Sequence, residues 1–97
     1  MSPLPSDLKN ELQKEYVATF DQKIFELDHA FQAKDVESLK NIFHKLAGSG
    51  ETYEMDEMSN IAKLGQKLLK DSFPEDKVKK AIDALKNIFK ERKKLHN

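Results

Sequence analysis

Apolar residues recur three and four positions apart through long stretches of this chain. A helix turns once in about 3.6 residues, so this spacing gathers the apolar side chains on one helical face. Only three glycines and three prolines occur among the 97 residues, so such helices meet few interruptions. The apolar positions of the four predicted helices are Val17, Phe20, Ile24, Leu27 and Phe31; Val36, Leu39, Ile42, Phe43 and Leu46; Met58, Ile61, Ala62, Gly65, Leu68 and Leu69; and Val78, Ile82, Leu85, Ile88 and Phe89.

Four amphipathic helices joined by short linkers can bury their apolar faces against one another. The sequence therefore predicts an all-α fold: an antiparallel four-helix bundle with a short additional N-terminal helical segment at one end. Leu8, Leu12 and Tyr16 mark that segment, and the pattern leaves open whether it is separate or part of one bent helix. A dimer built on heptads is the competing architecture, but short linkers favour intramolecular closure. Residues 1–5 are predicted to form a flexible lead and residues 6–97 a single domain.

Two helix starts carry local signals. Asp35 precedes an apolar-periodic stretch and is the predicted N-cap of its helix. Ser72-Phe73-Pro74-Glu75 combines the spacing of a capping box with a proline near a helix start. These signals place helix beginnings after both positions.

Charge and composition exclude several classes of function. The 17 basic and 17 acidic residues give a formal net charge of zero, which argues against a general nucleic-acid binder. The absence of cysteine rules out disulfides and thiolate zinc sites. No apolar run approaches the roughly 18 residues of a membrane span, and the first residues do not resemble a signal peptide. We therefore expect a soluble, cytoplasmic monomer that binds neither nucleic acid nor membrane and has no metal site.

His44 is predicted to face solvent from the second of the four helices. At about 100° per residue, it points well over a right angle away from the apolar positions of that helix. Its surface neighbours three and four positions away are Lys40, Asn41, Ala47 and Gly48. A glycine within a helix costs about 1 kcal/mol relative to alanine, so Gly48 needs a reason. Clearing space beside the imidazole for a docking partner would supply one, and Ala47 would clear a second side.

An exposed imidazole can act as a nucleophile near pH 7, because its unperturbed pKa is about 6.5. It can attack an aspartyl phosphate and later return the phosphoryl group to another aspartate. A solvated surface histidine is the ordinary alternative. His29, which has no small neighbours, and His96, near the C-terminus, fit that alternative.

The stretch His44-Lys45-Leu46-Ala47-Gly48-Ser49-Gly50 resembles the phosphorylation motif of histidine-containing phosphotransfer (HPt) domains, the relay modules of multistep two-component signalling. The resemblance spans roughly residues 8–95. It implies that His44 accepts a phosphoryl group from a receiver-domain aspartate and passes it to another receiver domain. It also implies that Gln66, 22 positions after His44, hydrogen-bonds the other ring nitrogen and orients the ring.

The chain departs from the family pattern at two positions. The family usually has lysine three positions after the histidine, where this chain has Ala47, and often glycine where it has Glu54. Lys40 or Lys45 could replace the missing cation, and Lys40 is the better candidate because residues i and i+4 share a helix face. Ser49 could hydrogen-bond the phosphoryl group or its own helix backbone, and the second arrangement is commoner.

The resemblance also implies the partners. They are receiver domains of response regulators or hybrid histidine kinases, and the receiver would supply Mg²⁺ and its acidic pocket. The resemblance also leads us to expect that the chain needs no cofactor and is a phosphotransfer protein without kinase activity of its own, and so not an enzyme. The expected docking surface around His44 comprises Lys40, Asn41, Ala47, Gly48, Lys63 and Gln66.

Two other functions remain open from the sequence. The first is a binding module on the same fold that inhibits or scaffolds a histidine kinase or receiver without carrying phosphate. Ala47 and Glu54 keep this alternative open. The second is a helical adaptor unrelated to phosphorelays, in which the His44 motif is a coincidence.

Overall fold

The computed structural model describes residues 6–95. The chain forms five α-helices: α1 (Ser6–Val17), α2 (Phe20–Gln32), α3 (Val36–Thr52), α4 (Asp56–Leu68) and α5 (Glu75–Leu95). The predicted flexible lead, residues 1–5, lies outside the described residues.

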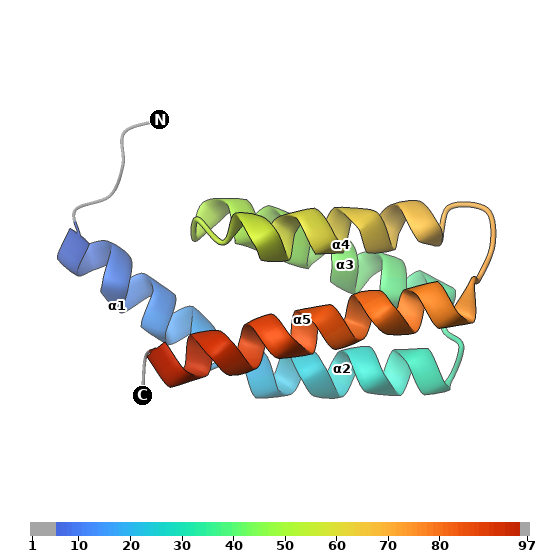
Figure 1. Cartoon of the computed structure of the whole chain (residues 1–97), viewed down its shortest axis with the longest axis horizontal. Coiled ribbons are helices and arrows are strands. Elements are labelled where there is room, and N and C mark those ends of the chain that lie inside the picture. Colours follow the sequence, from blue (N-terminus) through green and yellow to red (C-terminus); the bar gives the residue numbers. More distant parts are fainter. Residues whose placement is uncertain (1–5, 96–97) are drawn as a thin grey trace.

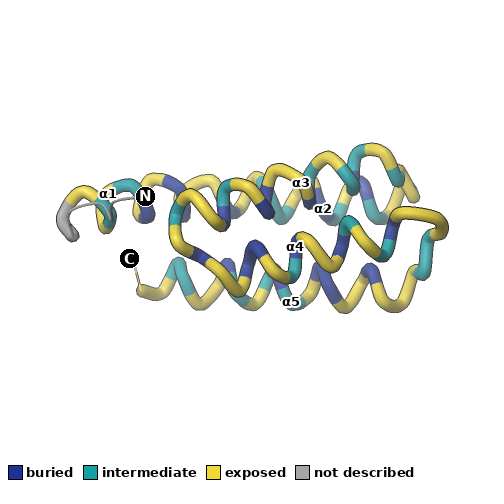
Figure 2. The backbone as a smooth tube through the Cα atoms, turned by 90° about the horizontal axis from the view of Figure 1, so that it is seen from above, coloured by how far each residue is buried: buried dark blue, intermediate teal, exposed yellow. Residues whose placement is uncertain are grey.

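Helices α2 to α5 form the predicted four-helix arrangement (Figure 1). They run antiparallel, and each packs on the next, with α5 returning to α2. The contact between α3 and α4 is the most extensive. Along each helix, buried and exposed segments alternate, as the apolar spacing predicts (Figure 2). Because α3 and α4 pack together most extensively, the backbone that carries the side chains along their outer edge is firmly held.

The N-terminal helical segment bends away from α2 at a two-residue turn, residues 18–19. The Thr19 N–H bonds the Tyr16 carbonyl at 3.0 Å, which closes α1, and the Lys23 N–H bonds the Thr19 carbonyl at 3.2 Å, which opens α2. Val17 therefore ends α1 and does not begin the next helix. The N-terminal segment is therefore a helix of its own, separated from α2 by this turn.

Tyr16 holds α1 against the turn between α3 and α4. Its ring stacks on that of Tyr53 with centroids 4.4 Å apart, and its hydroxyl is hydrogen-bonded to Ser49. The Gln13 amide donates to the Tyr53 carbonyl at 2.6 Å. Burial raises the pKa of the Tyr16 phenol, although the bond to Ser49 opposes that effect. This end of the bundle is therefore closed by a small aromatic and polar cluster.

Three phenylalanines from three helices form the centre of the core. Phe20, Phe43 and Phe89 are fully buried, and the rings of Phe20 and Phe89 stack with centroids 4.3 Å apart. Burying one such side chain contributes roughly 1.5–3 kcal/mol. Every apolar position predicted for the four helices of the bundle is buried or packs against this core, and Gly65 is buried where α4 meets Phe43. Leu8 of the N-terminal segment is exposed instead.

Glycines set how closely α3 and α4 approach. A Cβ atom on Gly50 would lie 2.9 Å from the backbone nitrogen of Ser59, and one on Gly65 would lie 2.7 Å from the ring of Phe43. Neither space admits a methyl group without movement of its neighbour. The Ser59 hydroxyl donates to the Ala47 carbonyl at 2.8 Å within this contact. These contacts fix the antiparallel register of the two helices.

Both predicted helix starts are present, and the N-cap of the first is confirmed. Asp35 is the N-cap of α3, and its carboxylate accepts hydrogen bonds from the Ser38 N–H at 3.1 Å and the Ser38 hydroxyl at 2.7 Å. These bonds lower the pKa of Asp35.

The second helix begins directly after Pro74, as the proline predicts, but the predicted capping box at residues 72–75 is not formed. Helix α5 begins at Glu75, and the Pro74 carbonyl accepts its first bond, from Val78 N–H at 2.9 Å. A box starting at Ser72 would need Phe73 in helical conformation, which a following proline disfavours. The helix therefore starts after the proline.

Candidate functional site

His44 lies exposed on the outer face of α3, as its angular position predicts. The Gln66 side chain reaches it from α4, and the amide Nε2 lies 3.2 Å from the ring Nδ1. The contact that the resemblance implies is therefore present. It leaves the other ring nitrogen, Nε2, as the atom available to a partner.

The hydrogen bond from Gln66 couples the tautomer of His44 to the orientation of an amide. When the amide NH₂ group donates to Nδ1, the ring proton of a neutral imidazole resides on Nε2. When the amide oxygen faces the ring instead, Nδ1 carries the proton and donates it, and the Nε2 lone pair is free. Turning the amide by 180° interconverts the two arrangements. Gln66 can therefore support a nucleophilic Nε2.

Gly48 leaves open space one turn after His44. A Cβ atom built on Gly48 would meet no atom of residues 6–95 within 4 Å, outside its own helix backbone and chain neighbours. Unlike Gly50 and Gly65, this glycine is not required by a helix contact. The structure therefore offers no packing reason for a residue that costs about 1 kcal/mol of helix stability.

Ala47 is not part of the open surface, and the prediction that it clears space beside His44 is wrong. Its residual exposure is 6%, and its carbonyl accepts the bond from Ser59 on α4. The close approach of α4 covers this side of α3. The docking surface predicted around His44 is therefore narrower on that side.

The lysines predicted around His44, two as replacement cations and Lys63 as part of the docking surface, lie on different sides of it. On the α4 side, Lys63 forms an ion pair with Glu51 of α3. The Lys40 Nζ atom lies 3.9 Å from the Oε1 atom of Glu37, which is one turn earlier on the same helix. Lys45 and Asn41 instead line the groove between α3 and α2. The structure therefore groups Lys63 and Gln66 on one edge of His44, with Lys45 on the other.

Ser49 does not join His44. Five residues at about 100° each place it about 140° around the helix from the histidine. Its hydroxyl donates to the Lys45 carbonyl at 2.8 Å and is also paired with the Tyr16 hydroxyl. The backbone arrangement is thus the one found, and the predicted support of a phosphoryl group by Ser49 is wrong.

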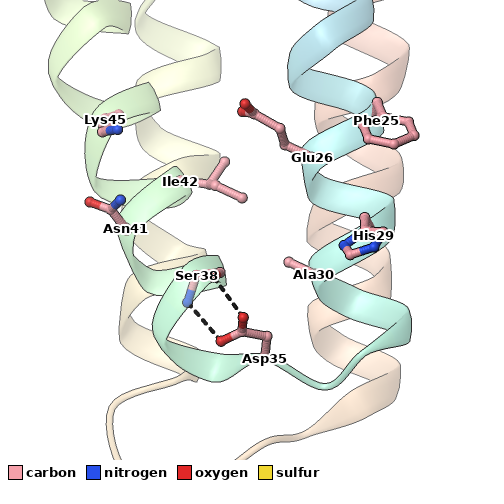
Figure 3. A pocket seen from close by; sticks show the side chains of 9 residues that line it. All are labelled: Phe25, Glu26, His29, Ala30, Asp35, Ser38, Asn41, Ile42 and Lys45. Carbon is pink, nitrogen blue, oxygen red and sulfur yellow. Dashed lines mark hydrogen bonds between the residues drawn. The ribbon is translucent and has the colours of Figure 1, made fainter.

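A groove lined by both polar and apolar side chains adjoins the site and was not anticipated from the sequence. It lies between α2 and α3, has a volume of about 330 Å³, and includes Phe25, whose exposure is 63% (Figure 3). The Phe25 and His29 rings lie 6.0 Å apart along its α2 wall. The one signal for this groove in the sequence is that Phe25 falls off the apolar stripe of its helix. Its α3 wall includes Asn41, Ile42 and Lys45.

Residues 6–95 include no group of three histidine, aspartate or glutamate side chains placed to hold a metal ion. Within the same residues, no helix has the length and apolar character needed to cross a membrane. Comparisons with protein-family models, curated proteins and solved structures found no match to this chain.

Proposed function

We propose that this chain is a phosphotransfer protein of the HPt kind, which accepts a phosphoryl group on His44 from one receiver domain and donates it to another. The observation that carries the proposal is the exposed His44 ring with Nδ1 held by Gln66, 3.2 Å away. The unfilled space at Gly48 beside that ring supports it further. The pathway belongs to two-component signalling in the cytoplasm.

The transfer step uses one lone pair of the ring. With the Gln66 amide turned so that its oxygen faces the ring, Nδ1 keeps its proton and donates a hydrogen bond to that oxygen, and the Nε2 lone pair attacks phosphorus in line. The N–P bond forms as the P–O bond of the aspartyl phosphate breaks, and the aspartate leaves as a carboxylate. Attack by an aspartate of a second receiver reverses these bond changes. The receivers supply Mg²⁺ and most of the transition-state stabilisation, so the chain is a substrate of transfer and not an enzyme.

The receiver would dock on the outer face of α3 and the neighbouring groove. Gly48 lets its active site close over His44, since no side chain projects there. Asn41 and Lys45 continue this face into the groove with Phe25. An exposed aromatic surrounded by polar residues is typical of interaction surfaces.

The test is intact-mass analysis after mixing the chain with a panel of phosphorylated receiver domains. We expect one added phosphoryl group on the wild type, labile in acid and stable in base, and none on His44→Gln. His29→Gln is the matched control for the labelled residue, because this variant loses another exposed histidine but keeps His44 and should still gain one phosphoryl group. Equal labelling of wild type and His44→Gln would contradict the assignment.

A second candidate function is a binding module that inhibits or scaffolds a kinase or receiver without carrying phosphate. The buried Ala47, where the family usually has a lysine, favours it, as does the exposed Phe25 groove. Receiver binding to the wild type without phosphoryl transfer would select this function. Absence of any receiver binding would favour an adaptor unrelated to phosphorelays.

A further inference from the structure

The ion pair between Lys63 and Glu51 lies on the same edge of the α3–α4 pair as His44. Lys63 precedes Gln66 by three residues on α4, so the two side chains are neighbours on one helix face. Gln66 contacts His44, and Lys63 contacts Glu51. Lys63 and Glu51 have exposed fractions of 54% and 59%, so both can move in solvent.

The register of the two helices brings Lys63 level with His44. Gly50 lies against Ser59 and Phe43 against Gly65, and these two contacts define which residues face each other. In this register residue 63 lies opposite residues 45 and 46. At 1.5 Å per residue, the backbone of Lys63 is thus within about 3 Å of His44 along the helix axis.

Glu51 draws the Lys63 ammonium away from this level. It follows His44 by seven residues, which is about 10 Å along α3 on nearly the same face. The positions between them on that face are Ala47 and Gly48, neither of which has a long side chain. Rotation of the lysine side chain would therefore carry its ammonium from Glu51 towards His44 past Gly48, where no side chain projects.

We propose that Lys63 is the cation that pairs with a phosphoryl group on His44, and that Lys63 stays paired with Glu51 until His44 is phosphorylated. This inference rests on the proposed function. A phosphorylated histidine places about two negative charges where the free ring has none, against one on Glu51. The ammonium moves to the larger charge, as a lysine can because its charge sits on a flexible stem.

Lys40 is less suited to this task. It lies one turn, about 6 Å, before His44 along α3. Its nearest carboxylate is Glu37, 3.9 Å away and still farther from His44 along the helix. The cation that the motif lacks at Ala47 is therefore supplied from α4.

The test uses phosphoramidate as the phosphoryl donor, so that no receiver is needed. The His44 Nε2 lone pair bonds to phosphorus while the P–N bond of the protonated donor breaks and ammonia leaves. We expect Lys63→Gln to slow formation of phosphohistidine by about fivefold at low salt, and less at high salt, because a nearby cation attracts the anionic donor. Lys63→Arg should restore most of the rate.

Three further variants distinguish a direct charge effect from a structural one. Glu51→Gln should speed phosphorylation in the presence of Lys63 and have a smaller effect in Lys63→Gln. Lys40→Gln should have a smaller effect than Lys63→Gln. Lys79→Gln is the matched control for net charge, because Lys79 lines the groove between α2 and α5 on the other side of the bundle. In ³¹P NMR titrations, Lys63→Gln should raise the apparent pKa of the phosphoryl group on His44.

Several outcomes overturn the inference. They are equal rates and equal ³¹P titrations for the wild type and Lys63→Gln, a larger effect of Lys40→Gln, or no phosphohistidine on the wild type. The first two leave the proposed function intact, because receivers can still exchange with His44. If phosphoramidate labels His44 with the expected dependence on Lys63 but no receiver exchanges, the proposed function fails while the pairing stands.

Discussion

Gly48 and Gly50 lie two residues apart on α3 and meet opposite surroundings. An added Cβ on Gly50 would lie 2.9 Å from the backbone of Ser59, whereas one on Gly48 would meet no atom of residues 6–95 within 4 Å. The inner face of α3 is filled to the backbone of α4, and its outer face is empty beside His44. The same residue type is thus required by the fold at one position and left without a structural purpose at the other.

The same division continues on α4. Gly65 is buried under the ring of Phe43, while the next residue, Gln66, reaches outward to His44. The inner residues fix the distance and register of the two helices. That register determines which outer residues lie near His44. The proposed chemistry of His44 therefore depends on inner contacts in which His44 takes no part. Substitutions on the two faces should therefore have effects of opposite sign on stability.

The largest effect is expected for Gly50→Ala. The new methyl group meets backbone atoms of Ser59, which cannot rotate away, so α3 and α4 must separate. We expect a loss of about 2 kcal/mol in the free energy of unfolding, net of the gain in helix propensity. Urea denaturation followed by circular dichroism measures it. An unchanged midpoint would show that the two helices are not held at this distance.

Gly65→Ala should cost less, about 1 kcal/mol, because the ring of Phe43 can shift where a backbone cannot. Its Cβ would lie 2.7 Å from the fully buried Phe43 ring. The pair Gly65→Ala and Phe43→Leu tests this reason, since the smaller side chain makes room for the methyl group. The double variant should lose less stability than the two single losses added together. Strict additivity would contradict a direct clash.

Gly48→Ala should stabilise the fold by up to about 1 kcal/mol, because it removes a helix glycine without a steric conflict. Gly48→Leu separates stability from function, because it should also keep the fold but place a bulky side chain beside His44. In that variant we expect normal urea unfolding and a reduced rate of phosphoryl transfer from receivers. If both variants destabilise the protein, the space beside Gly48 is not open to a side chain.

The smallest effect is expected at the exposed start of α3, where Asp35 acts through hydrogen bonds and not through steric fit. Its pKa is lowered by the bonds to Ser38. A carboxylate with a lowered folded-state pKa stabilises the fold above its unfolded value, here 3.8, and that contribution disappears as pH falls through the folded-state pKa. Asp35→Ala should therefore lower the melting temperature at pH 7, and the difference should shrink below pH 4. Asp35→Asn, which retains an N-cap acceptor, is the control.

Much of this molecule was predictable because helical periodicity is a local property. The spacing of apolar residues predicted the four-helix arrangement, and the angle of His44 from that stripe predicted its exposure. The same reasoning failed at Ala47, which lies about 60° closer to the apolar face than His44 at 100° per residue. At such an intermediate angle, burial depends on which neighbouring helix covers that side. Here α4 does.

The sequence by itself determined the helices, the N-cap at Asp35 and the outward direction of His44, because each depends on residues within a few turns of one another. Only the tertiary structure decided that Ser49 turns to Tyr16, that Phe25 lines a groove with α3, and that Lys63 faces Glu51. These pairings join residues from different helices. They are set by the close approach of α3 to α4 at Gly50 and Gly65 and by the bend after α1. The periodicity of one helix contains no information about which helix will lie beside it, so the register had to come from the assembled bundle.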